Sequence, residues 1–252
     1  MSSEEIKRLF PLIKSNYSGT YVTGGGHVDG EALIKSLQNK VIQNGGKIFR
    51  EKIILERFDN NQIKIISKED SFYHFDFVLL SVGAWLAELL KPLGYVTDIR
   101  PQKGKLFSIY NEKWKNQNWP VVIAPDGADI IPFNNGKILV GATHENDKGF
   151  DIGIDIKRVN ELKDKASQWI SVINEYPLDK IKVGIRAYTS DYSVLIGQVP
   201  HLENVWAISG LGSSGLTSGP YLGYQWNKLI QKGEWDICTD NYPIEKYISL
   251  NK

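Results

Sequence analysis

The order of segment types along the chain is the strongest constraint on its fold. Residues 28–44 predict an amphipathic helix, with apolar residues on one side and Gly45-Gly46 as its stop signal. The apolar run 77–82 is typical of a strand buried on both faces, and it leads into a helix-like segment. Residues 101–142 instead carry strand-like runs broken by Pro, Gly and Asn, which indicate an antiparallel sheet. A buried strand and a helix return over 204–231, so the order predicts an α/β (α+β) fold whose chain passes more than once between two domains.

Shorter patterns fill in the remaining segments. The runs 47–58 and 62–67 predict a hairpin, with the turn signal Asp59-Asn60-Asn61 between them. A charged helix is expected over 157–175 and a further strand over 182–189. Within the antiparallel block we expect four strands, at 105–110, 120–125, 128–133 and 137–143.

Composition excludes several classes of protein. Hydrophobic residues make up 42% of the 252 residues and charged residues 23%, as in globular domains and unlike disordered or fibrous chains. The 30 Lys and Arg nearly balance the 29 Asp and Glu, so we expect no surface for nucleic acid or an anionic membrane. No apolar run approaches the roughly 18 residues of a membrane span, and no signal sequence is visible. Cys238 is the only cysteine, which excludes a disulfide framework within one chain and fits a cytoplasmic location.

One glycine-rich segment matches a ligand-binding pattern. Gly210-Leu211-Gly212-Ser213-Ser214-Gly215 has the G-x-G-x-x-G spacing between a predicted strand and a predicted helix. Glycines there let the backbone turn sharply and approach a ligand, and the N–H groups at the helix start attract negative charge. A dinucleotide fingerprint also opens a βαβ unit, but the residues after Gly215 offer no convincing second strand. Three interpretations stay open: a self-contained dinucleotide site, a structural turn, and a loop that touches a cofactor held mostly elsewhere.

Candidate ligand-binding side chains are few. Arg186 lies in an apolar strand pattern, where its guanidinium either pairs with a buried acid or binds an anionic ligand such as a carboxylate. His144 follows a predicted strand and either faces a pocket or lies exposed at the strand end. No two of the four histidines have metal-ligand spacing, and no serine lies in a nucleophile elbow. We therefore expect neither a catalytic metal nor hydrolase chemistry.

Several segments, taken in order, resemble the D-amino-acid-oxidase-like superfamily of flavoproteins, and within it the branch of glycine oxidase and sarcosine oxidase. The resemblance extends over roughly residues 15–235. It rests on six stretches: GGHVDGEALIKSLQNKVIQNGGKI, FDFVLLSVGAW, RPQKGKLFSI, IIPFNNGKILVGATHE, VGIRAYTSDYSVLIG and NVWAISGLGSSGLTSGPYLG.

The resemblance implies FAD as the cofactor and the oxidation of a small amino acid or N-alkyl amino acid. It places Arg186 on the substrate carboxylate, and His144 and Asp129 near the substrate. It places Ile53 at a backbone contact to the adenine of FAD. The other implied cofactor contacts lie in two loops: Gly83, Ala84 and Trp85, and then Leu211, Gly212, Ser213, Ser214, Gly215, Leu216 and Thr217.

The resemblance also implies how the chain is divided. The remaining FAD-binding domain, a three-layer domain of the FAD/NAD(P)-binding type, would comprise 30–104 and 186–252. An antiparallel-sheet substrate domain would comprise 1–29 and 105–185. The family begins with a strand and a G-x-G-x-x-G motif that hold the ADP half of FAD, and nothing before Pro11 corresponds to them. The resemblance therefore implies a chain that is truncated at its N-terminus.

Departures from the family pattern bear on the substrate and on the alternative function. Asp129 stands where the family often has tyrosine, Phe133 where it has a basic residue, and Ala187 and Val194 where it has prolines. Ser213 replaces a second basic residue of glycine oxidases, so glycine is not assigned as the substrate. The alternative is a non-catalytic remnant or subunit that supplies a substrate domain to a separate nucleotide-binding chain. The partners expected are an amino-acid substrate and either a complementary N-terminal chain or further copies of this one.

Overall fold

The structure is a computed structural model that describes residues 1–14, 16–58, 61–67, 71–125 and 127–251. The chain divides into two compact units, each assembled from three separate stretches of sequence. The first unit comprises Met1–Asp29, Lys103–Glu145 and Phe150–Gly184, and the second comprises Gly30–Gln102, Asn146–Gly149 and Ile185–Lys252. Which unit would hold a flavin and which a substrate stays a prediction.

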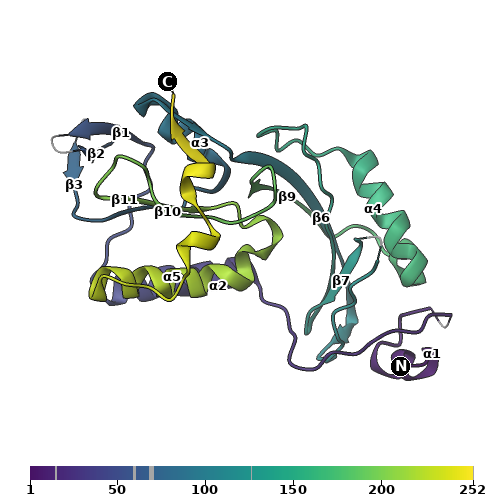
Figure 1. The fold of residues 1–252 in the computed structure, drawn as a ribbon. Helices are drawn as coiled ribbons and strands as arrows, with labels where there is room; N and C mark the ends of the chain where they lie inside the picture. The colour runs from purple at the N-terminus through teal and green to yellow at the C-terminus, as the bar shows by residue number, and fades with distance from the viewer. Residues whose placement is uncertain (15, 59–60, 68–70, 126, 252) are drawn as a thin grey trace. The chain divides into compact units, whose positions relative to one another are not determined.

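The first unit is built around a four-stranded sheet whose strands lie in the order β7-β8-β6-β9 (Figure 1). These strands are β6 (Arg100–Lys115), β7 (Asp129–Pro132), β8 (Asn135–Gly141) and β9 (Lys180–Tyr188). Strand β8 pairs antiparallel with both β7 and β6, as the sequence predicts for this block. The unit also contains helices α1 (Ser3–Leu9) and α4 (Ile156–Trp169) and the 3₁₀ turn η4 (Ser171–Asn174).

Local sequence accounts for the ends and the buried face of α4. The Asp155 carboxylate accepts a hydrogen bond from the Lys157 amide at 3.0 Å, which satisfies one N–H of the first turn. Val159, Leu162 and Ala166 recur at helical spacing and are buried. They pack into the core of the first unit, whose other members come from the sheet, η4 and the first residues of the chain, among them Phe10, Phe107, Ile109, Ile130, Ile138, Val140 and Ile173.

Among its described residues, the second unit has three small sheets and three α-helices. One sheet has the order β10-β11-β4, from β4 (Val78–Leu80), β10 (Leu195–Gln198) and β11 (Val205–Ser209), and its β4 and β11 run parallel. A second sheet joins β1 (Ile53–Phe58), β2 (Gln62–Ser67) and β3 (Phe72–His74), and a third joins β5 (Tyr95–Thr97) to β12 (Ile248–Leu250). The helices are α2 (Gly30–Gln43), α3 (Leu86–Leu90) and α5 (Gly215–Lys232), with 3₁₀ turns η2 (Gly83–Trp85), η3 (Lys91–Leu93), η5 (Gly212–Ser214), η6 (Thr239–Asn241) and η7 (Ile244–Lys246).

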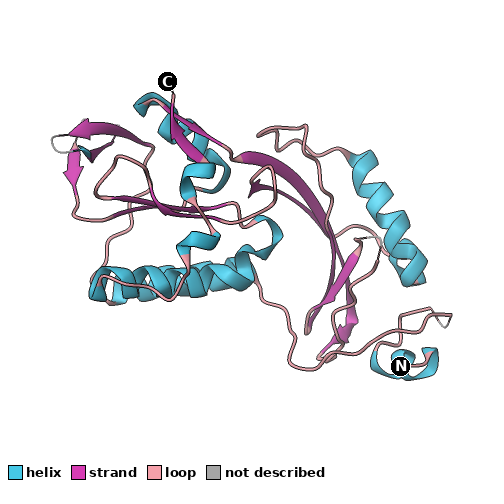
Figure 2. Cartoon of the chain, viewed as in Figure 1, coloured by secondary structure: helices cyan, strands magenta, loops and turns pink. Residues whose placement is uncertain are grey.

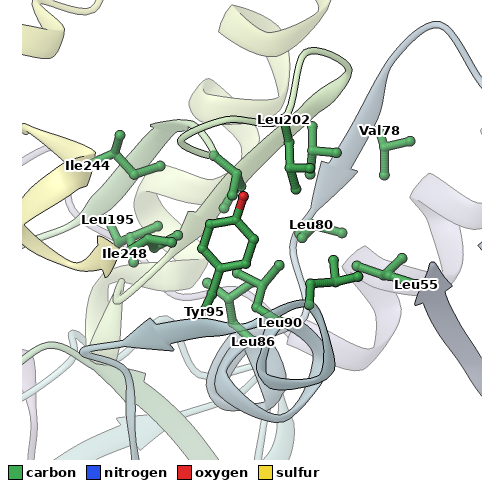
Figure 3. Packing of buried hydrophobic residues seen from close by; sticks show 14 of the residues in the cluster. Leu55, Val78, Leu80, Leu86, Leu90, Tyr95, Leu195, Leu202, Ile244 and Ile248 are labelled. Atoms are coloured by element: carbon green, nitrogen blue, oxygen red, sulfur yellow. The ribbon is translucent and has the colours of Figure 1, made fainter. Parts of the chain in front are cut away.

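Apolar side chains from all three sheets meet in one core in the second unit (Figure 3). Leu80 of β4, Leu195 of β10 and Ile248 of β12 are labelled there around the ring of Tyr95, whose hydroxyl donates to the Pro200 carbonyl at 2.5 Å. Asn204 links the β1-β2-β3 sheet to the start of β11. Its buried side chain accepts from the Ile63 amide at 3.0 Å and donates to the Phe75 carbonyl at 2.9 Å.

Most predicted elements form close to their predicted bounds, and three differ. The sequence predicts a hairpin strand over 47–58, but residues 47–52 form no strand and β1 starts at Ile53. Figure 2 shows the stretch between α2 and β1 as loop. The expected strand 120–125 is reduced to a single bridge between Val122 and Ile130. The expected helix 157–175 ends at Trp169 and continues as η4. Asp59 and Asn60 of the predicted turn lie outside the described residues.

Candidate functional site

Two glycine loops lie together at the carboxyl ends of β4 and β11. These strands run parallel, so both end at the same edge of their sheet. η2 (Gly83–Trp85) follows β4, and the loop 210–214 follows β11. The Ser209 hydroxyl at the end of β11 donates a hydrogen bond to the Gly83 carbonyl at 3.0 Å, which joins the two loops. In open α/β sheets, ligands bind at this edge.

The backbone of both loops has conformations that glycine allows. Gly210 has a φ of +73°, and a Cβ there would lie 2.9 Å from the Ser193 carbonyl oxygen, so a larger residue would clash. Gly83 and Gly212 have φ values of +58° and +53°, and a Cβ on either would meet nothing within 4 Å. A ligand therefore has room to approach the backbone at Gly83 and Gly212.

The start of α5 presents backbone donors beside these loops. Its N-cap residue, Ser214, makes no side-chain capping hydrogen bond. The hydroxyls of Thr217 and Ser218 donate back to the Ser214 carbonyl, at 2.8 and 2.7 Å, and so do not cap the N–H groups. Because the first N–H groups of a helix lack acceptors within the helix and carry partial positive charge, this end suits an electron-rich group.

The structure brings together ten of the eleven predicted cofactor contacts at this edge: Gly83, Ala84 and Trp85 of η2, and Leu211, Gly212, Ser213, Ser214, Gly215, Leu216 and Thr217. Ile53, the remaining one, lies at the start of β1 in another sheet of the same unit, where it packs against the core. Trp85 is 48% exposed.

Arg186 is half-buried and lies in the last part of β9, which belongs to the second unit because the first unit ends at Gly184. Burial lowers the pKa of its guanidinium, because removal from water disfavours the charged form. Asp191, an acid close by in sequence, is bound by a different set of donors. Its carboxylate pairs with Lys246 and accepts from the Thr189 hydroxyl at 2.9 Å and the Ser193 amide at 3.1 Å. The pKa of Asp191 therefore lies far below its usual range, chiefly because of Lys246.

Asp129 and His144 come from the same end of the sheet in the first unit. Asp129 opens β7 and pairs in register with Gly141, the last residue of β8. His144 follows Gly141 by three residues, and its side chain is exposed, whereas Asp129 is half-buried. The antiparallel register therefore brings these two predicted substrate contacts to one edge of the sheet. Arg186 belongs to the second unit.

The residues on either side of His144 are fixed to the first part of β6. Glu145 and Lys103 exchange two backbone hydrogen bonds of 2.9 Å, and the Thr143 amide donates to the Lys105 carbonyl at 3.0 Å. The Lys105 amide in turn donates to the Thr143 hydroxyl at 2.9 Å. His144 is thus exposed, while the residues before and after it, Thr143 and Glu145, are held to β6 by backbone hydrogen bonds.

A buried ion pair completes this framework. The Lys105 ammonium, 0% exposed, donates to both oxygens of Glu145, at 2.6 and 2.8 Å, and the Thr143 hydroxyl donates to one of them at 2.8 Å. Lys103, 2% exposed, pairs with Asp151 at 2.6 Å. Burial opposes ionisation of Glu145, but the hydrogen bonds from Lys105 and Thr143 outweigh it, and the pKa of the carboxyl lies below its ordinary value.

Neither lysine is among the functional residues that the sequence predicts. One signal was present in the sequence: Lys103 and Lys105 are two residues apart in a strand pattern, so they share one face of the strand. Their acidic partners, Asp151 and Glu145, lie 48 and 40 residues away, and only the tertiary fold brings them close.

Two kinds of feature are not found in the part of the chain that the structure describes: a cluster of metal ligands and a membrane-spanning helix. No three His, Cys, Asp or Glu side chains among those residues are grouped as ligands for a metal ion. None of the helices within the described ranges is both long and apolar enough to cross a bilayer.

Comparison with known proteins decides the family. The model of a family described as FAD dependent oxidoreductase (DAO) matches residues 1–225. The chain belongs to this family. It is 32% identical over 243 residues to YurR, an uncharacterised oxidoreductase of Bacillus subtilis, and 27% identical over 202 residues to a glycine oxidase of Pseudomonas putida. The matches cover 96% and 79% of this chain, but 65% and 54% of those proteins.

A solved structure supports the same relationship. The crystal structure of iminodiacetate oxidase from Chelativorans sp. BNC1 superimposes with a TM-score of 0.91 at 26% sequence identity, over 96% of this chain and 65% of that one. The mixed α/β fold with an antiparallel sheet is therefore a family fold. The chain spans about 65% of the length of the first relatives, so a third of their length has no counterpart here.

The residues at the β4 and β11 edge fit the cofactor for which the family is named. FAD has electron-rich ring and phosphate oxygens, and the start of α5 offers backbone donors without a side-chain cap. The open space beside Gly83 and Gly212 leaves room for a flat ring system close to the backbone. Leu211–Thr217 would therefore contact the flavin, and Gly83–Trp85 would line the same edge.

Proposed function

We propose that this chain forms the greater part of an FAD-dependent oxidoreductase that oxidises a small amino acid or N-alkyl amino acid. The observation that carries the proposal is the paired edge of β4 and β11, where two glycine loops and the start of α5 meet in a chain of the FAD dependent oxidoreductase family. Its relatives include a glycine oxidase and an iminodiacetate oxidase, which supports an amino-acid substrate.

The division of labour between cofactor and protein follows from the chemistry. FAD, when bound, supplies the acceptor for the hydride from the carbon that bears the amine. The protein must fix that carbon and keep the amine neutral, and it needs no obligatory side-chain acid or base. Arg186 holds the substrate carboxylate through its two-pronged guanidinium, and its half-burial strengthens that pairing. Asp129 and His144 lie close to the amine or the side chain of the substrate. Loss of the hydride and a proton leaves an imine, which water hydrolyses.

The two units would then have different tasks. Residues 30–104 and 186–252 form the flavin-binding part, a three-layer domain of the FAD/NAD(P)-binding type. Residues 1–29 and 105–185 form the substrate domain. The framework around Lys105 and Glu145 fixes the segment that carries His144, so it belongs to the substrate side.

Binding of FAD by this chain alone should be weak. About a third of the relatives' length has no counterpart in this chain. A nucleotide that is held at one end only loses much of its binding free energy. Titration of the purified chain with FAD, followed by flavin absorbance and fluorescence, should therefore show no stoichiometric complex. Tight one-to-one binding would contradict this expectation.

A second candidate function is a subunit without catalysis of its own. The exposed apolar face of α2, on which no residue is buried, favours a role in an assembly. The two candidate functions are distinguished by an experiment in which the assembly is reconstituted with FAD under anaerobic conditions. Bleaching of the oxidised flavin by glycine, sarcosine or iminodiacetate supports the oxidoreductase; no bleaching by any of them, in an assembly that retains flavin, supports the subunit.

A further inference from the structure

A cavity lies near the carboxyl end of α5, away from the loops at the β4 and β11 edge. Its volume is about 360 Å³, and it is lined by residues of β10, β11 and α5 and by part of the segment 235–245. Figure 1 shows that segment, in yellow, returning from α5 past β10. Leu229 lines the cavity and lies 14 residues after Gly215, the first residue of α5, which is about 21 Å along a helix. The cavity is therefore separate from the candidate cofactor site, although both belong to the second unit.

One wall of the cavity, at Trp235, is tied to α5 through the next residue. The Asp236 amide donates to the side-chain oxygen of Gln225, a buried residue of α5, at 2.8 Å. The Asp236 carboxylate accepts from Lys228, one turn further along the helix, at 2.5 Å. Trp235, directly before Asp236, is thereby held beside the end of α5.

A second wall, around Ile244, is fixed to the sheet. Ile244 is buried, and a Cβ at Gly197 of β10 would lie 3.1 Å from its side chain, so glycine lets the two segments approach this closely. Lys246 then pairs with Asp191, and the Tyr247 hydroxyl donates to the same carboxylate at 3.2 Å. Both walls are therefore fixed by contacts outside the cavity, which a ligand inside it would leave in place.

The lining combines aromatic rings with carboxylates. Trp206, Trp235 and Tyr242 line the cavity, and so do Asp240 and Glu245, whose side chains are exposed. Aromatic rings attract cations through their electron-rich faces and remove alkyl groups from water. The two kinds of group together suit a ligand that has both a positive charge and an apolar surface.

No cation of the protein neutralises these carboxylates within the described residues. The lining includes no Lys, Arg or His among them. Lys246, next to Glu245 in sequence, pairs with Asp191 instead, and neither Asp240 nor Glu245 has an ion pair in the part of the chain that the structure describes. Two carboxylates without a counter-charge repel an anion and attract a cation.

We propose that this cavity binds a small organic ammonium ion that carries methyl or alkyl groups on its nitrogen and has no carboxylate. A metal ion would need several oxygen ligands in the place of the aromatic rings. An amino acid would bring its own carboxylate next to Asp240 and Glu245. The ligand class therefore differs from that of the proposed substrate, and the site goes beyond the proposed function.

The test uses three probes that share a trimethyl group. Choline is a cation, neohexyl alcohol has carbon in the place of its nitrogen and is uncharged, and glycine betaine adds a carboxylate. The full chain is labelled with fluorotryptophan, and fluorine NMR follows its seven tryptophans, each assigned by a Trp→Phe variant. The signals of Trp206 and Trp235 report the cavity. Those of the first unit, Trp114, Trp119 and Trp169, are internal controls.

We expect choline to shift the signals of Trp206 and Trp235 and to leave those of the first unit in place. Choline should bind about tenfold more tightly than neohexyl alcohol, because ring faces and carboxylates attract its charge. Glycine betaine should bind more weakly than choline, because its carboxylate is repelled. The readout needs neither flavin nor turnover, so its result is independent of the proposed function.

A double variant tests the carboxylates. Asp240→Asn with Glu245→Gln removes both charges and keeps the shapes of the side chains, and because both are exposed the variant should fold normally. It should weaken choline binding about fivefold and leave the binding of neohexyl alcohol unchanged. The matched control, Glu4→Gln with Glu175→Gln, removes two exposed carboxylates of the first unit and should bind choline normally.

Any of three results would overturn the proposal. The first is that the signals of Trp206 and Trp235 stay unchanged throughout the choline titration. The second is equal affinity for choline and neohexyl alcohol, which would show a cavity that does not recognise charge. The third is a double variant at Asp240 and Glu245 that binds choline as tightly as the unsubstituted chain.

Discussion

Substitution of Glu145 by glutamine tests the framework that holds His144. Glutamine has nearly the same shape, so the change removes a charge without opening a cavity. The Lys105 ammonium, 0% exposed and 2.6 and 2.8 Å from the two carboxylate oxygens, would then be buried without a counter-charge. Thr143 would keep an acceptor only where the amide oxygen faces it.

The size of the effect follows from the burial of the pair. Removal of one partner of a buried ion pair costs about 3–5 kcal/mol, because the remaining charge stays desolvated. Glutamine still accepts one hydrogen bond, so we expect the lower end, about 3 kcal/mol, of a total stability of about 5–15 kcal/mol. Replacement of both partners, as Lys105→Met with Glu145→Leu, should cost less than the single change, since no charge is left buried.

Urea unfolding followed by circular dichroism measures the loss. Arg158→Ala is the matched control, because its pair with Glu161 is exposed on α4 and should contribute under about 1 kcal/mol. The folded-state pKa of Glu145 is lowered, so its contribution is present above the unfolded pKa and is lost as pH falls through the folded value. The acid limb of the stability profile should therefore flatten in Glu145→Gln. A loss no larger than that of the control, or a double variant less stable than the single one, would refute the reasoning.

Three further predictions concern other parts of the chain. In the assembled enzyme, Arg186→Ala should lower kcat/KM for amino acids by about ten- to a hundredfold, as for loss of a charge-assisted pair of about 1.5–3 kcal/mol, and should change turnover of an amine without a carboxylate much less. Asn204→Ala should lower the free energy of unfolding by about 1–3 kcal/mol in urea, because the Ile63 amide would stay buried without its acceptor. Asp191 has a lowered pKa, so its pairing with Lys246 stabilises the fold above the unfolded pKa and is lost in acid; Lys246→Met should make the melting temperature less dependent on pH between about 2 and 4, and an unchanged profile would contradict this.

The sequence could predict those features whose cause lies within a few residues. The helix expected over 28–44 forms as α2 (Gly30–Gln43), because its hydrogen bonds join residues four apart and Gly45, with a φ of +84°, ends it. The loop 210–215 forms a turn because Gly210 and Gly212 permit the positive φ that it needs. The contact between this loop and η2 does not follow from local patterns, because it spans 126 residues and depends on the parallel pairing of β4 with β11.

Features that depend on distant partners could not be predicted. The sequence shows that Lys105 is in a strand, but its partner Glu145 is 40 residues away and is found only through the register of the sheet. The ties from Asn204 to Ile63 and Phe75 span 141 and 129 residues. The expected strand 120–125 is a single bridge, because apolar composition indicates burial without fixing a neighbour.

Two adjacent segments, α2 and residues 47–52, differ in how well the sequence predicts them. α2 and residues 47–52 both have patterns typical of buried elements, and both are exposed. The helix persists because its backbone bonds are internal, whereas a strand needs another strand to supply its donors and acceptors. Whether each of the two predicted elements forms therefore depends on where the partners of its backbone hydrogen bonds lie.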